Sequence, residues 1–311
     1  MGKITVIGAS NWDMFTYCAR IPVVGETIKG NDFKTSYGGK ASNQAVQCAL
    51  LGSECVGDDM IGKNTIENFK SKNIDIKHVG LVKDVPSGCA TIIVDSKGNN
   101  NIIIVGGSND KLDQQDVIDA TFTIQKSSYL LCQLEVSLET TFKALKVAKQ
   151  PASSCKTILN LSPVTNDPLL MEMMEFVDIL LLNEVELIGI AKKTEEKIDM
   201  TSMSTLHQLV LDSVMNKYPT IQSVIVTLGE NGCLLVSRDY KGIDQYTHVP
   251  VTEKVVAVDT TGAGDSFTGA LAHYLDQSFD MAESISKASR VSAISVTRYG
   301  TQTSYPSKSD L

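Results

Sequence analysis

The sequence predicts an α/β fold in which a central, mostly parallel β-sheet is covered by helices on both faces, next to a small β-layer. After Ser108, short apolar runs alternate with stretches of helical periodicity, which is typical of a parallel sheet with crossover helices. Before Ser108, β-branched and aromatic pieces are interrupted by glycine and proline. A chain of 311 residues, 42% of them hydrophobic, is long enough to bury such a core.

The N-terminal third opens with an apolar run at 4–8, which predicts a buried strand ending at a turn. Residues 14–37 predict small strands and turns. A glycine pair then precedes a predicted helix at 40–51, where small apolar residues recur at helical spacing. Two β-branched runs within 88–105 flank a turn rich in Gly and Asn, which indicates a hairpin that joins the small β-layer.

The remaining elements follow in regular order. They are a helix at 113–118, a strand at 129–133, a helix at 138–149, strands at 157–160, 179–183 and 224–228, a second hairpin from 232 to 248, and helices at 264–276 and 281–296. No internal repeat, low-complexity tract or linker divides the chain. We therefore predict one domain, 1–311, with an inserted small β-sheet lid built from about 14–37 and 88–105.

Charge and composition disfavour several classes of partner. The net charge is −8 and no run of five Lys or Arg occurs, so nucleic acid and anionic membranes are poor partners. No apolar run reaches the roughly 18 residues that span a bilayer, and residues 1–9 lack the features of a signal peptide. The seven cysteines are scattered and never spaced C-x-x-C, which favours reduced thiols over a disulfide framework or a zinc site. These features predict a cytoplasmic protein.

The strongest chemical signal is Asp-Thr-Thr-Gly-Ala-Gly-Asp-Ser-Phe at 259–267, followed by an apolar helical stretch. Glycines at a helix N-terminus let backbone N–H groups converge on an anion, where the helix dipole adds positive potential. Asp265 falls in the same first turn, beside the anion, where it can take a proton from an attacking hydroxyl. Taken alone, the motif is equally compatible with an ordinary strand-to-helix turn in which Asp265 is only an N-terminal helix charge.

Together with other segments, this block resembles the ribokinase family of PfkB-type sugar kinases. The matching segments are Asn-Trp-Asp at 11–13, Pro-Val-Val-Gly-Glu-Thr at 22–27, Gly-Gly-Lys-Ala-Ser-Asn-Gln-Ala-Val at 38–46, Gln-Leu-Glu at 133–135, Asn-Glu-Val-Glu at 183–186, Thr-Leu-Gly-Glu-Asn-Gly at 227–232 and the block at 259–267. The likeness runs from Ile4 to Pro306. The ending at 300–306 is similar to that of the family members that phosphorylate ribose. It is less similar to the ending of the fructokinase-like and adenosine-kinase-like members.

The resemblance implies a three-layer ribokinase-like sandwich and ATP-dependent phosphorylation of D-ribose at its 5-hydroxyl. Asp265 would be the base, and Gly262, Ala263 and Gly264 the anion hole. The substrate would contact Asn11, Asp13, Gly39, Lys40, Ala41, Ser42, Asn43, Glu135 and Asp265. Simpler alternatives remain for several of these residues. Asp13, Asn43 and the glycine pair 38–39 would also fit cap or turn roles, Glu135 a solvated loop acid, and Lys40 a solvated first-turn lysine.

The resemblance also assigns residues to the nucleotide and to two cations. The nucleotide would contact Asn183, Thr227, Leu228, Gly229, Glu230, Asn231, Gly232, Gly264 and Ser289, although 227–232 also fits a plain strand-to-hairpin turn. Asn183 and Glu186 would organise Mg²⁺ through water, because magnesium keeps much of its hydration shell. K⁺ would lie near Asp259, Thr261, Ser295, Arg298, Gly300 and Ser304, bound mainly by carbonyl oxygens, with Arg298 contributing at most its carbonyl.

The sequence departs from the family pattern at three places. Ala41 and Ser42 stand where the family usually has Gly-Ala, which would narrow the sugar pocket slightly. Segment 52–59 is shorter than the family norm by about five residues, or most of a strand, which predicts either a very short strand beside 4–8 or a local defect in the sheet. Ser289 replaces the family's adenine-site asparagine. Two rival functions therefore remain: a kinase of another small sugar, such as deoxyribose or fructose, and a sugar-binding protein without turnover.

The small β-layer carries more apolar side chains than a thin lid can bury against its own domain. They are Tyr17, Ile21, Val23, Ile92, Val94, Ile102 and Ile104. Exposed apolar patches usually mark interfaces, so we expect a homodimer that pairs the two lids, with two-fold symmetry as the simplest arrangement. The alternative is a monomer whose lid folds flat onto the large domain.

Overall fold

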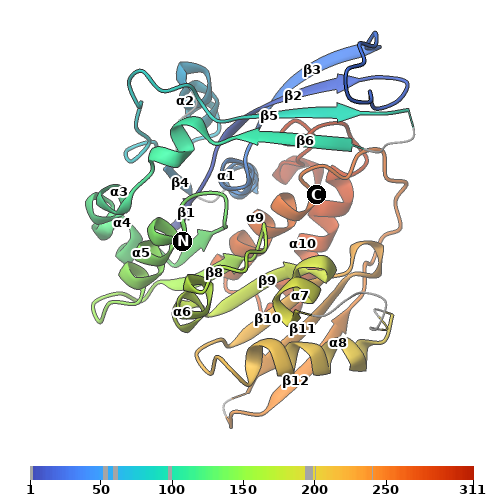
Figure 1. Ribbon diagram of the computed structural model, residues 1–311. Helices are drawn as coiled ribbons and strands as arrows, with labels where there is room; N and C mark the ends of the chain where they lie inside the picture. The colour runs from blue at the N-terminus through green and yellow to red at the C-terminus, as the bar shows by residue number, and fades with distance from the viewer. Residues whose placement is uncertain are drawn as a thin grey trace.

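The computed structural model describes residues 3–51, 55–58, 62–96, 100–192, 199, 201–239 and 241–311, and an eight-stranded sheet lies at its centre (Figure 1). The strand order is β4 (Cys55–Asp58), β1 (Ile4–Ile7), β7 (Tyr129–Cys132), β8 (Lys156–Asn160), β9 (Ile179–Asn183), β10 (Ser223–Thr227), β11 (Cys233–Arg238) and β12 (Asp244–Val249). The first six strands are parallel, whereas β11 and β12 form an antiparallel hairpin at one edge. The predicted mostly parallel α/β sheet is confirmed.

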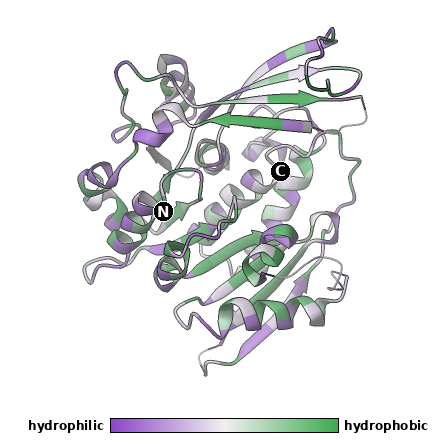
Figure 2. Ribbon diagram, viewed as in Figure 1, coloured by the Kyte–Doolittle hydropathy of each residue, from purple (hydrophilic) through white to green (hydrophobic). Residues whose placement is uncertain are grey.

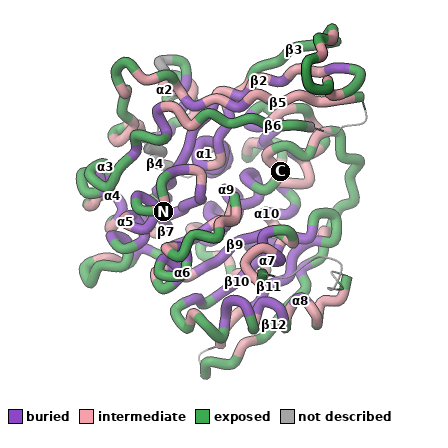
Figure 3. The backbone as a smooth tube through the Cα atoms, in the orientation of Figure 1, coloured by how far each residue is buried: buried purple, intermediate pink, exposed green. Residues whose placement is uncertain are grey.

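Helices cover both faces of this sheet and enclose two separate apolar cores. One face is covered by α1 (Lys40–Leu51), α2 (Gly62–Ser71), α9 (Ala263–Asp276) and α10 (Met281–Ser295). The other is covered by α3 (Gln114–Asp119), α4 (Thr121–Lys126), α5 (Leu138–Ala148), α6 (Leu169–Met173), α7 (Glu184–Ala191) and α8 (Met203–Val210). The central strands are hydrophobic (Figure 2) and buried (Figure 3), as expected for parallel strands covered on both sides. Within the described residues, no helix has the length and hydropathy needed to cross a membrane.

A second, four-stranded sheet lies across one end of the molecule, at the top of Figure 1. Its order is β3 (Asp32–Gly38), β2 (Asn11–Tyr17), β5 (Cys89–Val94) and β6 (Asn100–Val105). The predicted hairpin joins the earlier strands as expected, because β5 pairs with β2 and β6 pairs with β5. The sheet begins at Asn11, three residues before the predicted boundary at Met14, and residues 97–99 of the predicted turn lie outside the described residues.

The shortened segment at 52–59 still supplies a strand. β4 has four residues, and each of them pairs with one residue of the equally short β1, from Ile4 with Cys55 to Ile7 with Asp58. Of the two outcomes considered, the short strand is confirmed and the local defect in the sheet is wrong. Residues 52–54 and 59–61 lie outside the described residues.

One predicted surface residue of the small sheet is buried instead. Ile92 packs with Phe15 and Ala90 in a small apolar cluster, so the prediction that it adds exposed apolar surface is wrong. Cross-strand partners share a face of a sheet, and Ile92 is paired with Ile102 while Ala90 is paired with Ile104. Ile102 and Ile104, which are 54% and 57% exposed, therefore extend this apolar face to the edge strand β6.

Candidate active site

The glycine turn before α9 forms an open helix N-terminus. Gly262 is the N-terminal cap residue with φ +74°, a left-handed conformation that favours glycine, and no side chain caps the helix. A Cβ atom added to Gly264 would meet no atom within 4 Å, so its backbone borders open space. Because the first N–H groups of a helix have no partner within the helix, this turn offers donors and positive potential to an anion.

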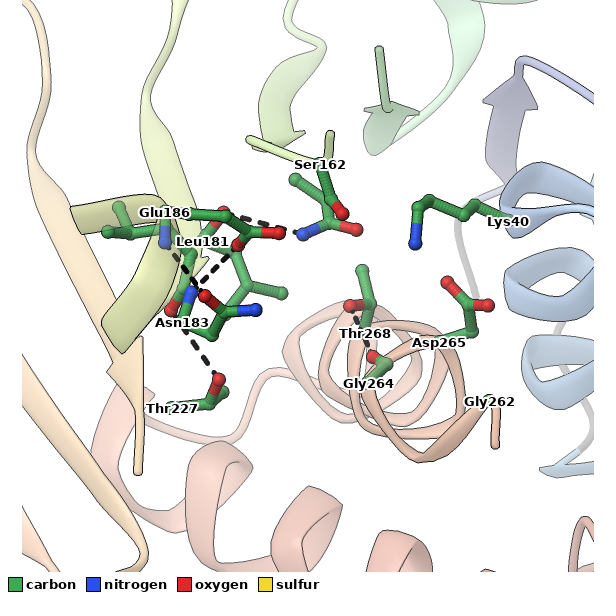
Figure 4. Close-up of a pocket in the computed structure, with 12 residues that line it drawn as sticks. Lys40, Ser162, Leu181, Asn183, Glu186, Thr227, Gly262, Gly264, Asp265 and Thr268 are labelled. Carbon is green, nitrogen blue, oxygen red and sulfur yellow. Dashed lines mark hydrogen bonds between the residues drawn. The ribbon is translucent and has the colours of Figure 1, made fainter. Parts of the chain in front are cut away.

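A pocket opens from this turn toward the carboxyl ends of β8, β9 and β10. It is lined by Lys40, Asn160, Ser162, Leu181, Leu182, Asn183, Glu186, Thr227, Gly262, Gly264, Asp265 and Thr268. In Figure 4 the Lys40 amine and the Asp265 carboxylate lie on one side of this space, and Asn183, Glu186 and Thr227 on the other. The structure thus gathers predicted residues from four distant motifs around one pocket. Lys40 is half-buried and lines this pocket.

Asp265 is held by two amide side chains from α1. It is only 7% exposed. Its Oδ2 accepts a hydrogen bond from Asn43 Nδ2 at 3.0 Å, and its Oδ1 accepts one from Gln44 Nε2 at 3.0 Å. Two N–H donors aimed at one carboxylate fix its plane. The contact also gives Asn43 a role beyond a helix-capping or turn residue.

Three more charged groups surround this carboxylate. Burial, and then the nearby charges of Glu135 and Asp265, raise the pKa of Asp13 to about 7. Burial likewise raises the pKa of Glu135, opposed by Lys40, whose backbone N–H donates to Glu135 Oε2 at 2.8 Å. This contact rules out Glu135 as a solvated loop acid. Burial alone would lower the pKa of Lys40, but the carboxylates of Asp265, Glu135 and Glu186 raise it, so its ammonium form persists.

The glycine pair Gly38–Gly39 makes room for other parts of the protein. A Cβ atom on Gly38 would lie 2.0 Å from Asp13 Oδ2, and one on Gly39 would lie 2.6 Å from the Ala9 carbonyl oxygen. The pair therefore allows strand β2, with Asp13, to approach the start of α1. Asn11 is fixed in the same region, because its Oδ1 accepts from Asn109 Nδ2 at 2.8 Å.

Ala41 and Ser42 have structural contacts and do not line the pocket. Ala41 is part of the apolar core, and the Ser42 hydroxyl accepts from Gln302 Nε2 at 2.7 Å. The Ser42 backbone N–H is also used, since it donates to the Ala9 carbonyl. Their side chains therefore do not narrow the described pocket.

Of the residues predicted for the nucleotide in 227–232, Thr227 lines the pocket. The others form a short helical turn (η5, Gly229–Asn231), closed by a hydrogen bond from Leu228 N to the Gly232 carbonyl at 2.8 Å. Gly229 and Gly232 have φ of +55° and +85°, so the turn requires both glycines. Ser289, on α10, is buried and hydrogen-bonded to the Cys233 thiol.

Asn183 and Glu186 cap α7 reciprocally. Asn183 N donates to Glu186 Oε2 at 2.8 Å, and Glu186 N donates to Asn183 Oδ1 at 2.9 Å. This reciprocal cap uses one carboxylate oxygen of Glu186 and leaves the other for the pocket. Among the described residues no three His, Cys, Asp or Glu side chains gather as a metal cage. A single free carboxylate oxygen beside amide and hydroxyl groups suits a hydrated Mg²⁺ rather than a fully protein-bound ion.

The residues predicted for K⁺ lie in two adjoining loops, except Ser295, which is the last residue of α10. Asp259 joins these loops, because its Oδ1 accepts from Thr261 N and its Oδ2 from Gly300 N, both at 2.9 Å. The Ser295 and Ser304 hydroxyls donate to the carbonyls of Ser292 and Thr301. The Arg298 guanidinium is paired with Asp310 at 3.2 Å. The carboxylate of Asp259 is thus a loop brace, which leaves carbonyl and hydroxyl oxygens as the donors for a monovalent cation.

Three residues of this region carry no assignment from the sequence. Gln44 contacts Asp265 directly, Gln302 donates to Asn43 Oδ1 at 3.1 Å, and the buried Tyr305 hydroxyl donates to the Gly262 carbonyl at 2.9 Å. Burial, and then the charges of Asp265 and Asp13, raise the pKa of Tyr305 well above its ordinary value. The available signal for Gln44 is its position: it is a polar residue between Asn43 and an alanine, on the helix face that the core covers.

The fold and site together define a kinase of small molecules: an α/β sheet with an anion-binding glycine turn and a buried carboxylate facing one pocket. A family model described as pfkB family carbohydrate kinase matches residues 1–308. The chain belongs to this family.

Comparisons with individual relatives agree with this family assignment. The chain is 54% identical to a ribokinase of Dictyostelium discoideum, with 99% of each chain covered. It is 38% identical to a deoxyribokinase of Salmonella typhi, covering 98% of this chain and 95% of the relative. Among solved structures it is similar to an Arabidopsis thaliana ribokinase complexed with ribose and ATP, with a TM-score of 0.86, 25% identity, and 99% and 96% of the two chains covered.

Proposed function

We propose that this protein phosphorylates D-ribose at the 5-hydroxyl, using ATP. The observation that carries the proposal is the position of Asp265, whose buried carboxylate borders the same pocket as the uncapped glycine turn at 262–264. A base and an anion-binding turn in one helical turn suit in-line transfer of a phosphoryl group to a hydroxyl. The similarity to ribokinases, at 54% identity over nearly the whole chain, supports ribose as the acceptor.

In the proposed reaction the sugar 5-oxygen attacks the γ-phosphorus of ATP. A bond forms between that oxygen and phosphorus, the bond from phosphorus to the β–γ bridging oxygen breaks, and ADP leaves with the electron pair. Asp265 takes the hydroxyl proton, while the N–H groups of the turn at 262–264 receive the negative charge on the phosphoryl oxygens. The Lys40 ammonium, which lines the same space, adds positive charge there.

The sugar hydroxyls would be held by Asp13, Asn43 and Glu135. Carboxylates accept hydrogen bonds from hydroxyls, and the Asn43 amide can both donate and accept. Asn43 is bonded to Asp265, and Glu135 is bonded to the Lys40 backbone, so these groups already adjoin the base. The small sheet carries Asp13 on β2 and would act as the lid over the sugar.

We assign Mg²⁺ to the Asn183–Glu186 side of the pocket, through water, and K⁺ to the carbonyl oxygens near Asp259 and Gly300. When bound, magnesium neutralises the charge of the ATP phosphates. Asp259 holds the turn before α9 against the C-terminal loop, so a cation beside it would stiffen the anion hole.

The proposal includes a homodimer in the cytoplasm. Ile102 and Ile104 are exposed on the face of the small sheet that also carries Asp13, which gives a second copy an apolar surface beside the sugar site. The cysteines at 18, 48, 89, 132, 155 and 233 are free thiols, in keeping with a reducing compartment.

The experiment is ribose-stimulated ADP release by the purified protein with ATP and magnesium. D-ribose, 2-deoxy-D-ribose and D-fructose are compared at equal concentration, and ribose is expected to give the highest kcat/KM. The 38% identity to a deoxyribokinase makes deoxyribose the second candidate, and a clear preference for it would replace the ribose assignment. Ribose binding by calorimetry without magnesium-dependent ADP release would indicate a sugar-binding protein without turnover.

A further inference from the structure

The Asp265 carboxylate is the end point of two converging chains of amide side chains, all of them buried except the half-buried Asn68. In one chain Gln133 Nε2 donates to Gln44 Oε1 at 2.5 Å, and Gln44 Nε2 donates to Asp265 Oδ1 at 3.0 Å. In the other, Asn68 Nδ2 donates to Gln302 at 2.9 Å, Gln302 donates to Asn43, and Asn43 donates to Asp265. Every amide therefore points its N–H toward the next acceptor and finally toward the carboxylate.

The orientation of Gln44 is determined by its neighbours. Its Nε2 also lies 3.3 Å from Asn160 Oδ1, so a flipped amide would direct its oxygen at two acceptors. Its Oε1 accepts from Gln133, which is itself completely buried. Gln44 thus has one low-energy orientation, the one that donates to Asp265.

Holding Gln44 in this way has a structural cost. Gln133 Oε1 is buried without a hydrogen-bond partner among the described residues. The amide also needs space, since a Cβ atom on Gly8 would lie 2.2 Å from this oxygen. Buried polar atoms are nearly always paired, and an exception calls for an explanation such as a catalytic role. The unpaired oxygen follows directly from turning the Gln133 N–H toward Gln44.

We propose that Gln44 is a positioning residue for Asp265, oriented by Gln133, and that it aims the carboxylate at the sugar hydroxyl in the transition state. This rests on the proposed function of Asp265 as base. Gln44 acts through the carboxylate, so its loss lowers kcat with little effect on the KM for ribose or ATP.

The test compares Gln44→Met with Gln47→Met. Gln47 is a matched control: it lies one turn further along α1, is equally buried, and makes two hydrogen bonds, from Ser266 Oγ at 2.8 Å and to the Pro306 carbonyl at 3.0 Å. We expect Gln44→Met to lower kcat roughly tenfold or more with both KM values within about threefold. Gln47→Met should lose comparable thermal stability and keep kcat within about threefold.

Two further variants test for effects on kcat that a purely structural role of Gln44 would not produce. Gln133→Met removes the donor to Gln44 together with the unpaired oxygen, so kcat should fall while thermal stability is retained. Gln44→Glu can donate to Asp265 only when protonated. Its kcat relative to wild type should therefore rise as the pH falls from about 8 to about 6, whereas that of Gln44→Met stays flat.

Other titratable groups also face Asp265. They are Asp13 on β2, Glu135 after β7, Lys40 on α1 and Tyr305 in the C-terminal segment. All four are present in wild type and in both Gln44 variants, and Gln44→Met is the reference that has no titratable group at position 44.

The outcomes separate the inference from the proposed function. Wild-type protein without ribose-dependent ADP release would overturn the function. An active wild type with an unchanged kcat in Gln44→Met, or an equal loss in Gln47→Met, would overturn the role of Gln44. If Gln44→Met does not fold, Gln133→Met decides, and an unchanged kcat in that variant refutes the inference.

Discussion

Replacing Asp13 with asparagine should stabilise the protein without ligand while weakening ribose binding. Asp13 is 7% exposed and lies near Glu135 and Asp265, and its pKa is raised from 3.8 to about 7. The native state therefore retains a proton that the unfolded chain releases above pH 4. The stability that this proton provides is fully present below the unfolded pKa and is lost as the pH rises to about 7.

The expected size follows from the pKa difference. Between pH 5 and pH 8, the free energy of unfolding of wild type should fall by about 3 kcal/mol relative to that of Asp13→Asn. One pKa unit corresponds to about 1.4 kcal/mol, and only the interval up to about pH 7 contributes. For 311 residues, an unfolding entropy of about 2.1 cal/mol/K per residue converts this into a relative shift in Tm of about 4 °C. Because the amide of Asp13→Asn does not titrate, the Tm of the variant should increase relative to that of wild type as the pH rises.

The assay is thermal unfolding of both proteins without ribose, at half-unit steps from pH 5 to pH 8.5. Glu172→Gln, at an exposed position on α6, is the control for the loss of one negative charge. Its Tm difference from wild type should be nearly independent of pH. A constant difference between Asp13→Asn and wild type across this range would refute the reasoning that Asp13 is a destabilised buried acid.

Four further predictions concern the site and the assembly. Asp265→Asn should lower kcat by roughly 100-fold or more while calorimetry shows nearly unchanged ribose binding; equal losses of both would make Asp265 a sugar ligand instead. Gly264→Ala should fold normally, since its Cβ meets no atom within 4 Å, but raise the KM for ATP or lower kcat by about tenfold, because the methyl group enters the anion hole; wild-type kinetics would contradict an anion site there. Potassium should raise activity over lithium at constant ionic strength, and equal rates would argue against the cation site. Light scattering should give a dimer for wild type and a monomer for Ile104→Lys, whereas a monomeric wild type would refute the dimer.

The local pattern of the sequence was sufficient to predict most strands of the large sheet. The strand predicted at 179–183 coincides with β9, and the helices predicted at 264–276 and 281–296 differ from α9 and α10 by one residue at one end. Strong periodicity and glycine boundaries explain this agreement. α7 and α8 were not predicted, although the parallel pairing of β9 and β10 requires a crossover between them.

What the sequence by itself determined is therefore the α/β alternation and the glycine-rich turn with Asp265 beside it, because both are encoded by residues close together in the chain. Only the tertiary structure decided the surroundings of that carboxylate. Gln44 lies 221 positions from Asp265 and Gln133 lies 89 positions from Gln44, and neither contact has a local signature. The same holds for the burial of Ile92 and for the raised pKa of Asp13, since burial and charge at one point are set by segments that only the packed sheets bring together.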